Sequence, residues 1–294
     1  MNYLLSRLQM GGKPVFITGH GRSGTTWIGN TFSQAQGVLY CNEPCNPDMV
    51  KGADFSAWFR YIRSDENDPY FERCLDTAFK GLMSYRSDWL KQRAYRRLLP
   101  GYRVVVKEVA SFMSLEWVCK RYDPDVLVVF RHPCAVALSE KNKKTPIESP
   151  IMEMIKQAAL VDDHLKPYEE VFEKAKTPFE IYGAVWAARN RVIVDLMPHY
   201  PEWKILFYED LCRNPLDCFQ ELFDRFNLDW SDKVEKFIKQ TTTEHEPGTY
   251  SISRVSEQQL NKWKSVLTKS EIDQIRSFVE PFNLPFYNQD SDWV

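Results

Sequence analysis

The chain has 294 residues, with 38 Lys and Arg residues against 40 Asp and Glu residues and a formal net charge of −2. Hydrophobic residues make up 44% of the sequence and charged residues 27%, the balance of a packed globular protein rather than of a disordered chain. The near-neutral charge excludes a protein that coats nucleic acid, which needs a large excess of cations, but it leaves room for a local basic pocket.

Membrane and export functions are not expected either. No stretch reaches the ~18 uninterrupted apolar residues of a spanning helix, and the N-terminal stretch lacks the apolar core of a signal peptide. The seven cysteines lack the paired spacings of a disulfide framework or a zinc site, and Cys41 and Cys45 are the only near pair. We therefore expect a cytoplasmic protein with reduced thiols, no membrane span and no nucleic-acid partner.

Apolar runs of strand length alternate with longer segments of helical period, which predicts an α/β fold with a mainly parallel sheet. The runs are β-branched and nearly continuous, as in strands covered on both faces, and they lie at 14–19, 102–108, 125–130 and 203–208. Helices are expected at 25–35, 114–122, 135–142, 151–174, 179–197 and 215–226. Because helices would flank the central sheet on both sides, we expect three layers.

The segment 44–100 has a different character, since it is rich in aromatic and charged residues and shows no strand pattern. We interpret it as a helical insertion packed over the sheet edge, where it would form an acceptor pocket or lid. The alternative is that its aromatic residues simply belong to the core. Since the chain contains no repeat, low-complexity tract or linker, residues 1–294 are predicted to form a single domain.

A glycine-rich turn, residues 19–27 (GHGRSGTTW), lies between the first strand and the first helix. Glycines let several backbone N–H groups converge on one anion, and the N-terminus of the helix adds its dipole. Thr25 and Thr26 add hydroxyl donors in the first helical turn. This context predicts a phosphate-binding loop in a P-loop-type fold.

The loop departs from that of nucleotide triphosphatases, which reads G-x-x-x-x-G-K-[ST]. Thr25 occupies the lysine position, the cation has moved to Arg22, and the third strand ends in Arg131 rather than in an aspartate that would hold Mg²⁺. Arginines in place of Lys and Mg²⁺ suit a group with less negative charge than a γ-phosphoryl. A sulfuryl group fits this description, and no metal is then required.

At this point the sequence resembles the sulfotransferases that use 3′-phosphoadenosine 5′-phosphosulfate (PAPS). GRSGTTW at 21–27 resembles the 5′-phosphosulfate loop of that family, and VVFRHPCAVALSEKNK at 128–143 resembles its 3′-phosphate motif. FYEDL at 207–211 resembles a strand end of the family, and SRVSEQQLNKWKSVLTKSEI at 253–272 its C-terminal loop and helix, which cover the donor.

The resemblance implies which residues hold PAPS and its product, adenosine 3′,5′-bisphosphate (PAP). The 3′-phosphate would be held by Arg131 at a strand end and by Ser139 about two helical turns later. The remaining donor-site candidates, from the loop and the C-terminal segment, are Gly21, Arg22, Ser23, Gly24, Thr25, Thr26, Trp27, Arg254 and Lys262. Trp27 or Trp263 would stack on adenine, although both also suit the core.

The proton acceptor is open among several residues. Glu43 follows the loop at the position where the tyrosylprotein-type and carbohydrate-type enzymes carry a catalytic Glu, and we favour it. Lys107 and Glu108 end one strand, so only one of them should point into the site. The resemblance favours Lys107 as the cation over the leaving group and leaves Glu108 as the second candidate base. Two histidines, His20 and His132, are further candidates because imidazole titrates near neutrality.

The sequence thus predicts a PAPS-dependent O-sulfotransferase. Its catalytic residues would be Glu43, Lys107 and Arg22, and its acceptor a carbohydrate or another small-molecule alcohol. A P-loop phosphoryl kinase and a non-catalytic nucleotide-binding protein are the alternatives.

Overall fold

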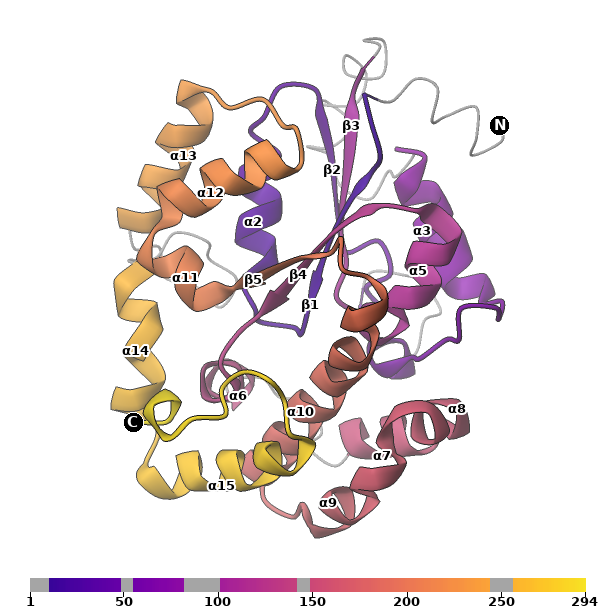
Figure 1. The fold of residues 1–294 in the computed structure, drawn as a ribbon, viewed down its shortest axis with the longest axis vertical. Helices are drawn as coiled ribbons and strands as arrows, with labels where there is room; N and C mark the ends of the chain where they lie inside the picture. Colours follow the sequence, from indigo (N-terminus) through magenta and orange to yellow (C-terminus); the bar gives the residue numbers. More distant parts are fainter. Residues whose placement is uncertain (1–10, 49–54, 82–100, 142–148, 244–255) are drawn as a thin grey trace.

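The computed structural model describes residues 11–48, 55–81, 101–141, 149–243 and 256–294. These residues contain a five-stranded parallel sheet with the strand order β2-β3-β1-β4-β5. Its strands, shown in Figure 1, are β1 (Val15–Gly19), β2 (Val38–Asn42), β3 (Arg103–Lys107), β4 (Asp125–Phe130) and β5 (Lys204–Phe207). The apolar runs predicted β1, β3, β4 and β5 to within two residues. They missed β2, an edge strand whose last residue is exposed.

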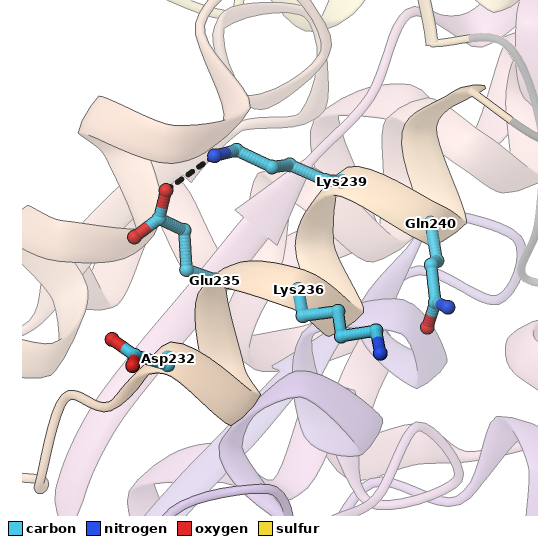
Figure 2. A pocket seen from close by; sticks show the side chains of 5 residues that line it. All are labelled: Asp232, Glu235, Lys236, Lys239 and Gln240. Carbon is cyan, nitrogen blue, oxygen red and sulfur yellow. Dashed lines mark hydrogen bonds and ion pairs between the residues drawn. The ribbon is translucent and has the colours of Figure 1, made fainter.

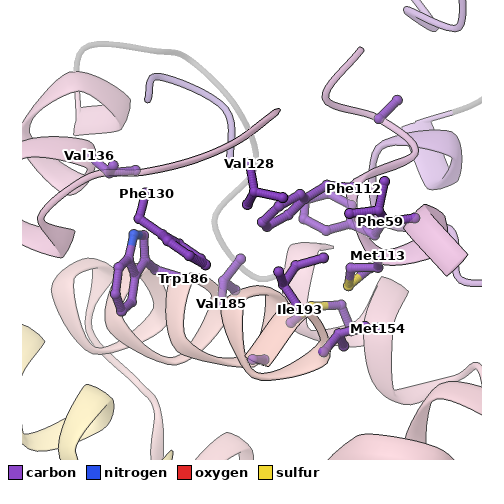
Figure 3. Close-up of a cluster of buried hydrophobic side chains, with 14 of the residues drawn as sticks. Phe59, Phe112, Met113, Val128, Phe130, Val136, Met154, Val185, Trp186 and Ile193 are labelled. Carbon is purple, nitrogen blue, oxygen red and sulfur yellow. The ribbon is translucent and has the colours of Figure 1, made fainter. Parts of the chain in front are cut away.

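The sheet is covered on both faces, since alternate residues of a strand enter different hydrophobic clusters. On β1, Phe16 belongs to one cluster, and Val15 and Ile17 belong to the other. The Val15 face packs against α2 (Thr25–Phe32), α12 (Pro215–Arg225) and α13 (Asp232–Thr243). The Phe16 face packs against α3 (Pro69–Phe79), α5 (Leu115–Tyr122) and α10 (Pro178–Leu196). Figure 3 shows part of the second contact, with Val185 and Trp186 of α10 facing Phe130. The expected three-layer α/β fold is confirmed.

The segment 151–174 forms several short helices, so the prediction of one continuous helix there is wrong. It contains α7 (Ser149–Ile155), α8 (Ala158–Leu160), a π turn at Val161–Leu165, a 3-10 turn at Lys166–Tyr168 and α9 (Glu169–Lys174). Gln157 has extended backbone angles between α7 and α8, and its amide donates to the carbonyls of Phe59 and Glu153. Pro167 cannot continue a helical hydrogen-bond ladder, which accounts for the second break.

The described part of the segment 44–100 contains a 3-10 turn at Phe55–Phe59 and then α3, joined by irregular chain. Asp68 caps α3 by accepting a hydrogen bond from the Phe71 amide, and Pro69 occupies the first helical turn. Phe59 and Phe71 are buried against the Phe16 face of the sheet. These aromatic residues therefore belong to the core, which was the alternative interpretation of the segment.

The C-terminal part of the chain lies across the carboxyl ends of β4 and β5. It comprises α14 (Ser256–Val266), α15 (Lys269–Val279) and an aromatic tail. In the tail, Phe286 packs on Phe130 and Phe207, with its ring centroid 4.4 Å from that of Phe130. The tail therefore fixes the strand ends that carry the predicted 3′-phosphate motif.

Candidate active site

The glycine-rich turn folds back on itself between β1 and α2. Arg22 and Gly24 have positive φ angles of 71° and 85°, and the Ser23 amide donates to the His20 carbonyl at 3.2 Å. Gly24 precedes α2, and a Cβ atom there would overlap the Tyr208 ring, so both its φ and its surroundings require glycine. The turn therefore presents its backbone at the N-terminus of a helix, where anions bind.

The side chains of this turn fit an anionic group. Ser23 is fully buried, and its hydroxyl has no hydrogen-bond partner in the part of the chain that the structure describes. A buried hydroxyl without a partner is costly unless a ligand supplies one. Thr25 is buried and Thr26 partly buried in the first turn of α2. An oxyanion in the turn would give the Ser23 hydroxyl an acceptor.

The two predicted donor motifs meet directly. The Arg22 Nε donates to the Ser139 hydroxyl at 2.7 Å, and the Arg131 Nη1 donates to the Arg22 carbonyl at 2.7 Å. The Arg131 guanidinium lies over the Tyr208 ring, 4.2 Å from its centroid. β1 and β4 are neighbours, with Gly19 in register with Val129, so their carboxyl ends bring the two loops together. α6 (Pro133–Lys141) then carries Ser139 back towards the glycine-rich turn.

Two further predicted residues form an ion pair at the same edge of the sheet. The Lys107 ammonium, on a side chain only 2% exposed, contacts the Glu43 carboxylate. Asn42 is in register with Lys107, and the Glu43 amide donates to the Lys107 carbonyl at 2.7 Å. Glu43 has a φ of 49°, and Asn46 donates to its second carboxylate oxygen at 2.7 Å. The Glu43 side chain is 20% exposed, against 2% for Lys107, so Glu43 is the more accessible member of the pair.

Glu108 points away from this pair, as the alternation of strand side chains requires. Its carboxylate is fully buried and accepts backbone hydrogen bonds from Cys45 at 2.6 Å and from Val109 and Ala110 at 2.8 Å. Burial, followed by the negative charge of Glu43, raises the Glu108 pKa to about 7. Glu108 therefore ties the loop after β2 to the loop after β3.

Of the histidines considered as bases, His132 is held inside an aromatic cluster. Its ring stacks on Trp263 at 4.4 Å, and Tyr287 and Trp293 contact it edge-on. Burial lowers the His132 pKa to about 3, so the ring is neutral at physiological pH. The His20 Nδ1 lies 2.9 Å from the Gly21 carbonyl and so contacts its own turn.

The two tryptophans considered for adenine both pack in the protein interior. The Trp27 indole donates to the Thr241 hydroxyl at 3.0 Å and packs edge-on against Phe219. Trp263 packs on His132 and is 2% exposed. These contacts account for both rings as core residues, and stacking on adenine stays a prediction.

Of the two predicted C-terminal cations, only Lys262 lies within the described residues. Lys262 is exposed on α14, which packs against α6 and α11 (Tyr208–Arg213). Arg254 lies outside the described residues.

Sequence reasoning assigned no role to Tyr208 or Glu209, although both belong to the FYEDL motif. Tyr208 supports the Arg131 guanidinium and fills the space beside Gly24. The Glu209 carboxylate accepts the His132 amide at 3.0 Å and the Tyr287 hydroxyl at 2.7 Å. The position of the motif at a strand end was the available signal. Glu209 thus fixes the backbone immediately after Arg131.

Other features of the described residues do not resemble a site. No helix in them is long and apolar enough to cross a membrane, and no cluster of three or more His, Cys, Asp or Glu side chains within these ranges is arranged to hold a metal ion. A hollow on α13 is lined by charges of both signs, two of which, Glu235 and Lys239, form an ion pair (Figure 2). Such a mixed surface is typical of a solvated helix face.

Comparison with known proteins shows the family. The model of the sulfotransferase family matches residues 14–232, which is most of the chain, and the chain belongs to that family. It is therefore an enzyme of sulfuryl transfer. A search of curated proteins finds no match.

Solved structures of sulfotransferases resemble the chain at low identity. The sulfotransferase domain from the curacin biosynthetic pathway is 16% identical, with 90% of this chain and 96% of that one covered and a TM-score of 0.47. The sulfotransferase domain of the Synechococcus PCC 7002 olefin synthase is 15% identical, with 92% of this chain and 95% of that one covered and a TM-score of 0.48. Mouse sulfotransferase SULT7A1, which was crystallised with PAP, is 13% identical, with 99% of this chain and 91% of that one covered and a TM-score of 0.45.

Proposed function

We propose that residues 1–294 form one PAPS-dependent O-sulfotransferase domain, which moves a sulfuryl group from PAPS to an acceptor hydroxyl and releases PAP. The observation that carries the proposal is the meeting of Arg22, Ser139 and Arg131 at the carboxyl ends of β1 and β4. Two motifs far apart in the sequence thereby form one cationic site beside a helix N-terminus. PAPS has anionic groups at both ends of its ribose, and such a site suits both.

The donor would be held by two sets of residues. For the 5′-phosphosulfate we assign the turn and the first residues of α2, namely Gly21, Arg22, Ser23, Gly24, Thr25, Thr26 and Trp27, the last through its backbone. For the 3′-phosphate we assign Arg131 and Ser139, because a guanidinium and a hydroxyl give charged and directional hydrogen bonds to phosphate. Arg254 and Lys262 stay predicted contacts of the C-terminal segment, and no residue is assigned to a metal.

Glu43 and Lys107 would perform the chemistry. Glu43, ionised beside a buried ammonium, accepts the proton of the acceptor hydroxyl as the acceptor oxygen forms its bond to sulfur. Lys107 stabilises the charge that develops on the bridging oxygen when the bond between sulfur and the 5′-phosphate breaks. Arg22 holds the transferring group in line between them. Both cations are fixed before the reaction, so little reorganisation is needed.

The acceptor belongs to the class of small-molecule alcohols, and the resemblance of the Glu43 position to carbohydrate-type enzymes favours a sugar hydroxyl. The cytoplasm remains the predicted cellular location. All seven cysteines are free thiols in the structure, which is consistent with a reducing compartment.

Calorimetric titration tests the donor assignment. We expect PAP to bind more tightly than ATP, with an affinity that EDTA does not change. A screen of glycan, phenol and lipid acceptors with labelled PAPS, read by product mass, then tests turnover. Tighter binding of ATP, or activity that chelation abolishes, would support a phosphoryl kinase instead. PAP binding without turnover on any acceptor would support a nucleotide-binding protein.

A further inference from the structure

Arg189 is a buried cation that the assigned chemistry does not use. It lies on α10, one helical turn from both Val185 and Ile193, which face Phe112 and Val128 of the core in Figure 3. Residues one turn apart share a helix face. Arg189 therefore points from α10 towards the sheet, and it is only 4% exposed.

The guanidinium of Arg189 has few protein partners. Its Nη2 donates to the Val109 carbonyl at 3.0 Å, and within the described ranges its buried Nε has no acceptor. Phe59 and Phe112 flank it, with ring centroids 5.6 and 5.7 Å from the guanidinium carbon. Glu140 acts on it electrostatically without accepting a hydrogen bond from it. One N–H group out of five thus has an acceptor in the described structure.

Such a poorly paired buried cation is costly unless a ligand completes it. Arg103, whose side chain is 11% exposed, contacts the Asp125 carboxylate at 2.6 Å, although its Nε also lacks an acceptor in the described residues. Arg131 resembles Arg189 more closely: in the described residues it donates to a backbone carbonyl, packs on an aromatic ring and has no carboxylate partner. Since we assign Arg131 to an anionic ligand, the similar surroundings of Arg189 indicate a further anion subsite.

The position of Arg189 places this subsite beside the reaction centre. Its partner Val109 follows Lys107 by two residues, and Glu108 between them binds the loop that carries Glu43. Phe59, which flanks the guanidinium, is a core residue of the segment 44–100 that packs over the Phe16 face of the sheet. The anion that Arg189 meets is therefore expected on the acceptor, not on the donor, whose phosphates are assigned to Arg22 and Arg131.

We propose that Arg189 recognises a carboxylate on the acceptor, so that the substrate class is a hydroxy acid. The inference rests on the proposed function. A guanidinium presents a planar pair of N–H donors that matches the two oxygens of a carboxylate. The buried surroundings strengthen that contact and disfavour a neutral acceptor, which would leave the guanidinium without a hydrogen-bonded carboxylate.

The test uses pairs of acceptors that differ only in charge. Aliphatic and aromatic hydroxy acids are compared with their primary amides, both in turnover with labelled PAPS and in calorimetric binding to the PAP complex. We expect the wild type to prefer the acid of at least one pair by about 10- to 100-fold in kcat/KM and in affinity, the range given by one charged hydrogen-bonded contact. The loss in the amide should appear mainly in KM.

Variants then assign the preference to Arg189. Arg189→Met should bring acid and amide to within about threefold of each other, and Arg189→Lys should keep part of the preference. Arg191→Met is the matched control, because Arg191 lies on the same helix but pairs with Asp195, and it should keep the wild-type preference. PAP affinity and melting temperature show that each variant is folded.

The outcomes separate this proposal from the function it rests on. Failure of the wild type to bind PAP contradicts the proposed function. In that case, comparing the binding of the acids to the wild type and to Arg189→Met still tests the carboxylate subsite. If PAP binds but no acid is preferred over its amide in turnover or binding, the carboxylate subsite is wrong and the sulfotransferase proposal stands. The subsite is equally overturned by an acid preference that survives in Arg189→Met, or by a preference for phosphate-bearing alcohols over every acid.

Discussion

Replacing Glu43 by Gln separates its proposed role as the base from its contacts within the protein. The substitution keeps the size of the side chain and leaves an oxygen that can accept a hydrogen bond from Lys107 or Asn46. It removes the negative charge beside an ammonium that is 2% exposed, and with it the proton acceptor. Neither the negative charge of Glu43 nor its ability to accept a proton is used to bind the donor.

Two magnitudes follow from the structure. A general base contributes about 10²- to 10⁴-fold to a rate, so kcat should fall by that factor. Breaking a buried ion pair costs about 3–5 kcal/mol in the free energy of unfolding. Because the Glu43 side chain is 20% exposed and Gln still accepts a hydrogen bond, we expect the lower end, about 3 kcal/mol.

Glu108→Gln is the matched control, since Glu108 is the other carboxylate at this edge of the sheet. Its oxygens accept three backbone N–H groups, and a Gln amide would direct a donor towards at least one of them. An unsatisfied buried donor costs about 1–3 kcal/mol, so this variant should lose stability. The folded fraction should keep kcat within about tenfold of the wild type, because Glu108 does not face the ion pair.

The assay measures single turnover with labelled PAPS at saturating acceptor, alongside PAP affinity and urea denaturation. Glu43→Gln should lose turnover while PAP affinity stays within about threefold. If Glu43→Gln retains more than about a tenth of the wild-type rate, the assignment of Glu43 as the base is wrong. If Glu108→Gln shows the larger loss of turnover, Glu108 takes its place.

Three further predictions concern the donor site and the pH dependence of stability. Arg131→Ala should weaken PAP binding by about 10- to 100-fold while leaving the affinity for adenosine 5′-phosphosulfate, which lacks the 3′-phosphate, within about threefold in calorimetry. Gly24→Ala should lower both the melting temperature and PAP affinity, because its positive φ and the Tyr208 ring exclude a side chain, whereas Gly21→Ala, whose Cβ meets no atom within 4 Å, should change melting little. The Glu108 pKa is raised from 4.5 to about 7, so the native state holds a proton that the unfolded chain releases, and stability from this group falls by roughly 3 kcal/mol as pH rises through that window. The free energy of unfolding, measured by urea denaturation at several pH values between 4.5 and 7, should fall with rising pH in the wild type. The fall should be absent in Glu108→Gln.

The features that could be predicted from the sequence depend on short-range patterns. The glycine spacing of the turn and the apolar runs that became β1, β3, β4 and β5 are local, and they fix where the loops leave the sheet. Since the carboxyl ends of parallel strands share one edge, the loops that carry Arg22 and Arg131 are expected at that edge, and the observed pairing of β1 with β4 brings them into contact.

The features that could not be predicted depend on contacts between distant segments. Which residue of the Lys107 and Glu108 pair faces Glu43 depends on the register of β2, the edge strand that the apolar runs do not reveal. The sequence makes His132 a candidate base, but the ring of Trp263, which is distant in the sequence, stacks on it in the fold. Arg189 belongs to no motif in the sequence. That its Nε has no acceptor among the described residues becomes evident only when α10 is packed on the sheet.

The ion pair between Glu43 and Lys107 would link proton removal to departure of the leaving group in the proposed reaction. While Glu43 is ionised, it neutralises much of the field of the Lys107 ammonium. When Glu43 takes the proton of the acceptor, that neutralisation ends, and the ammonium acts fully on the oxygen that separates from sulfur. The two residues would then act as a unit, and effects of residues that act as a unit are not additive. The double variant Glu43→Gln/Lys107→Met should therefore be little slower than the slower of its two single variants. A rate loss equal to the product of the two single losses would show that the residues act independently and that the pair serves stability alone.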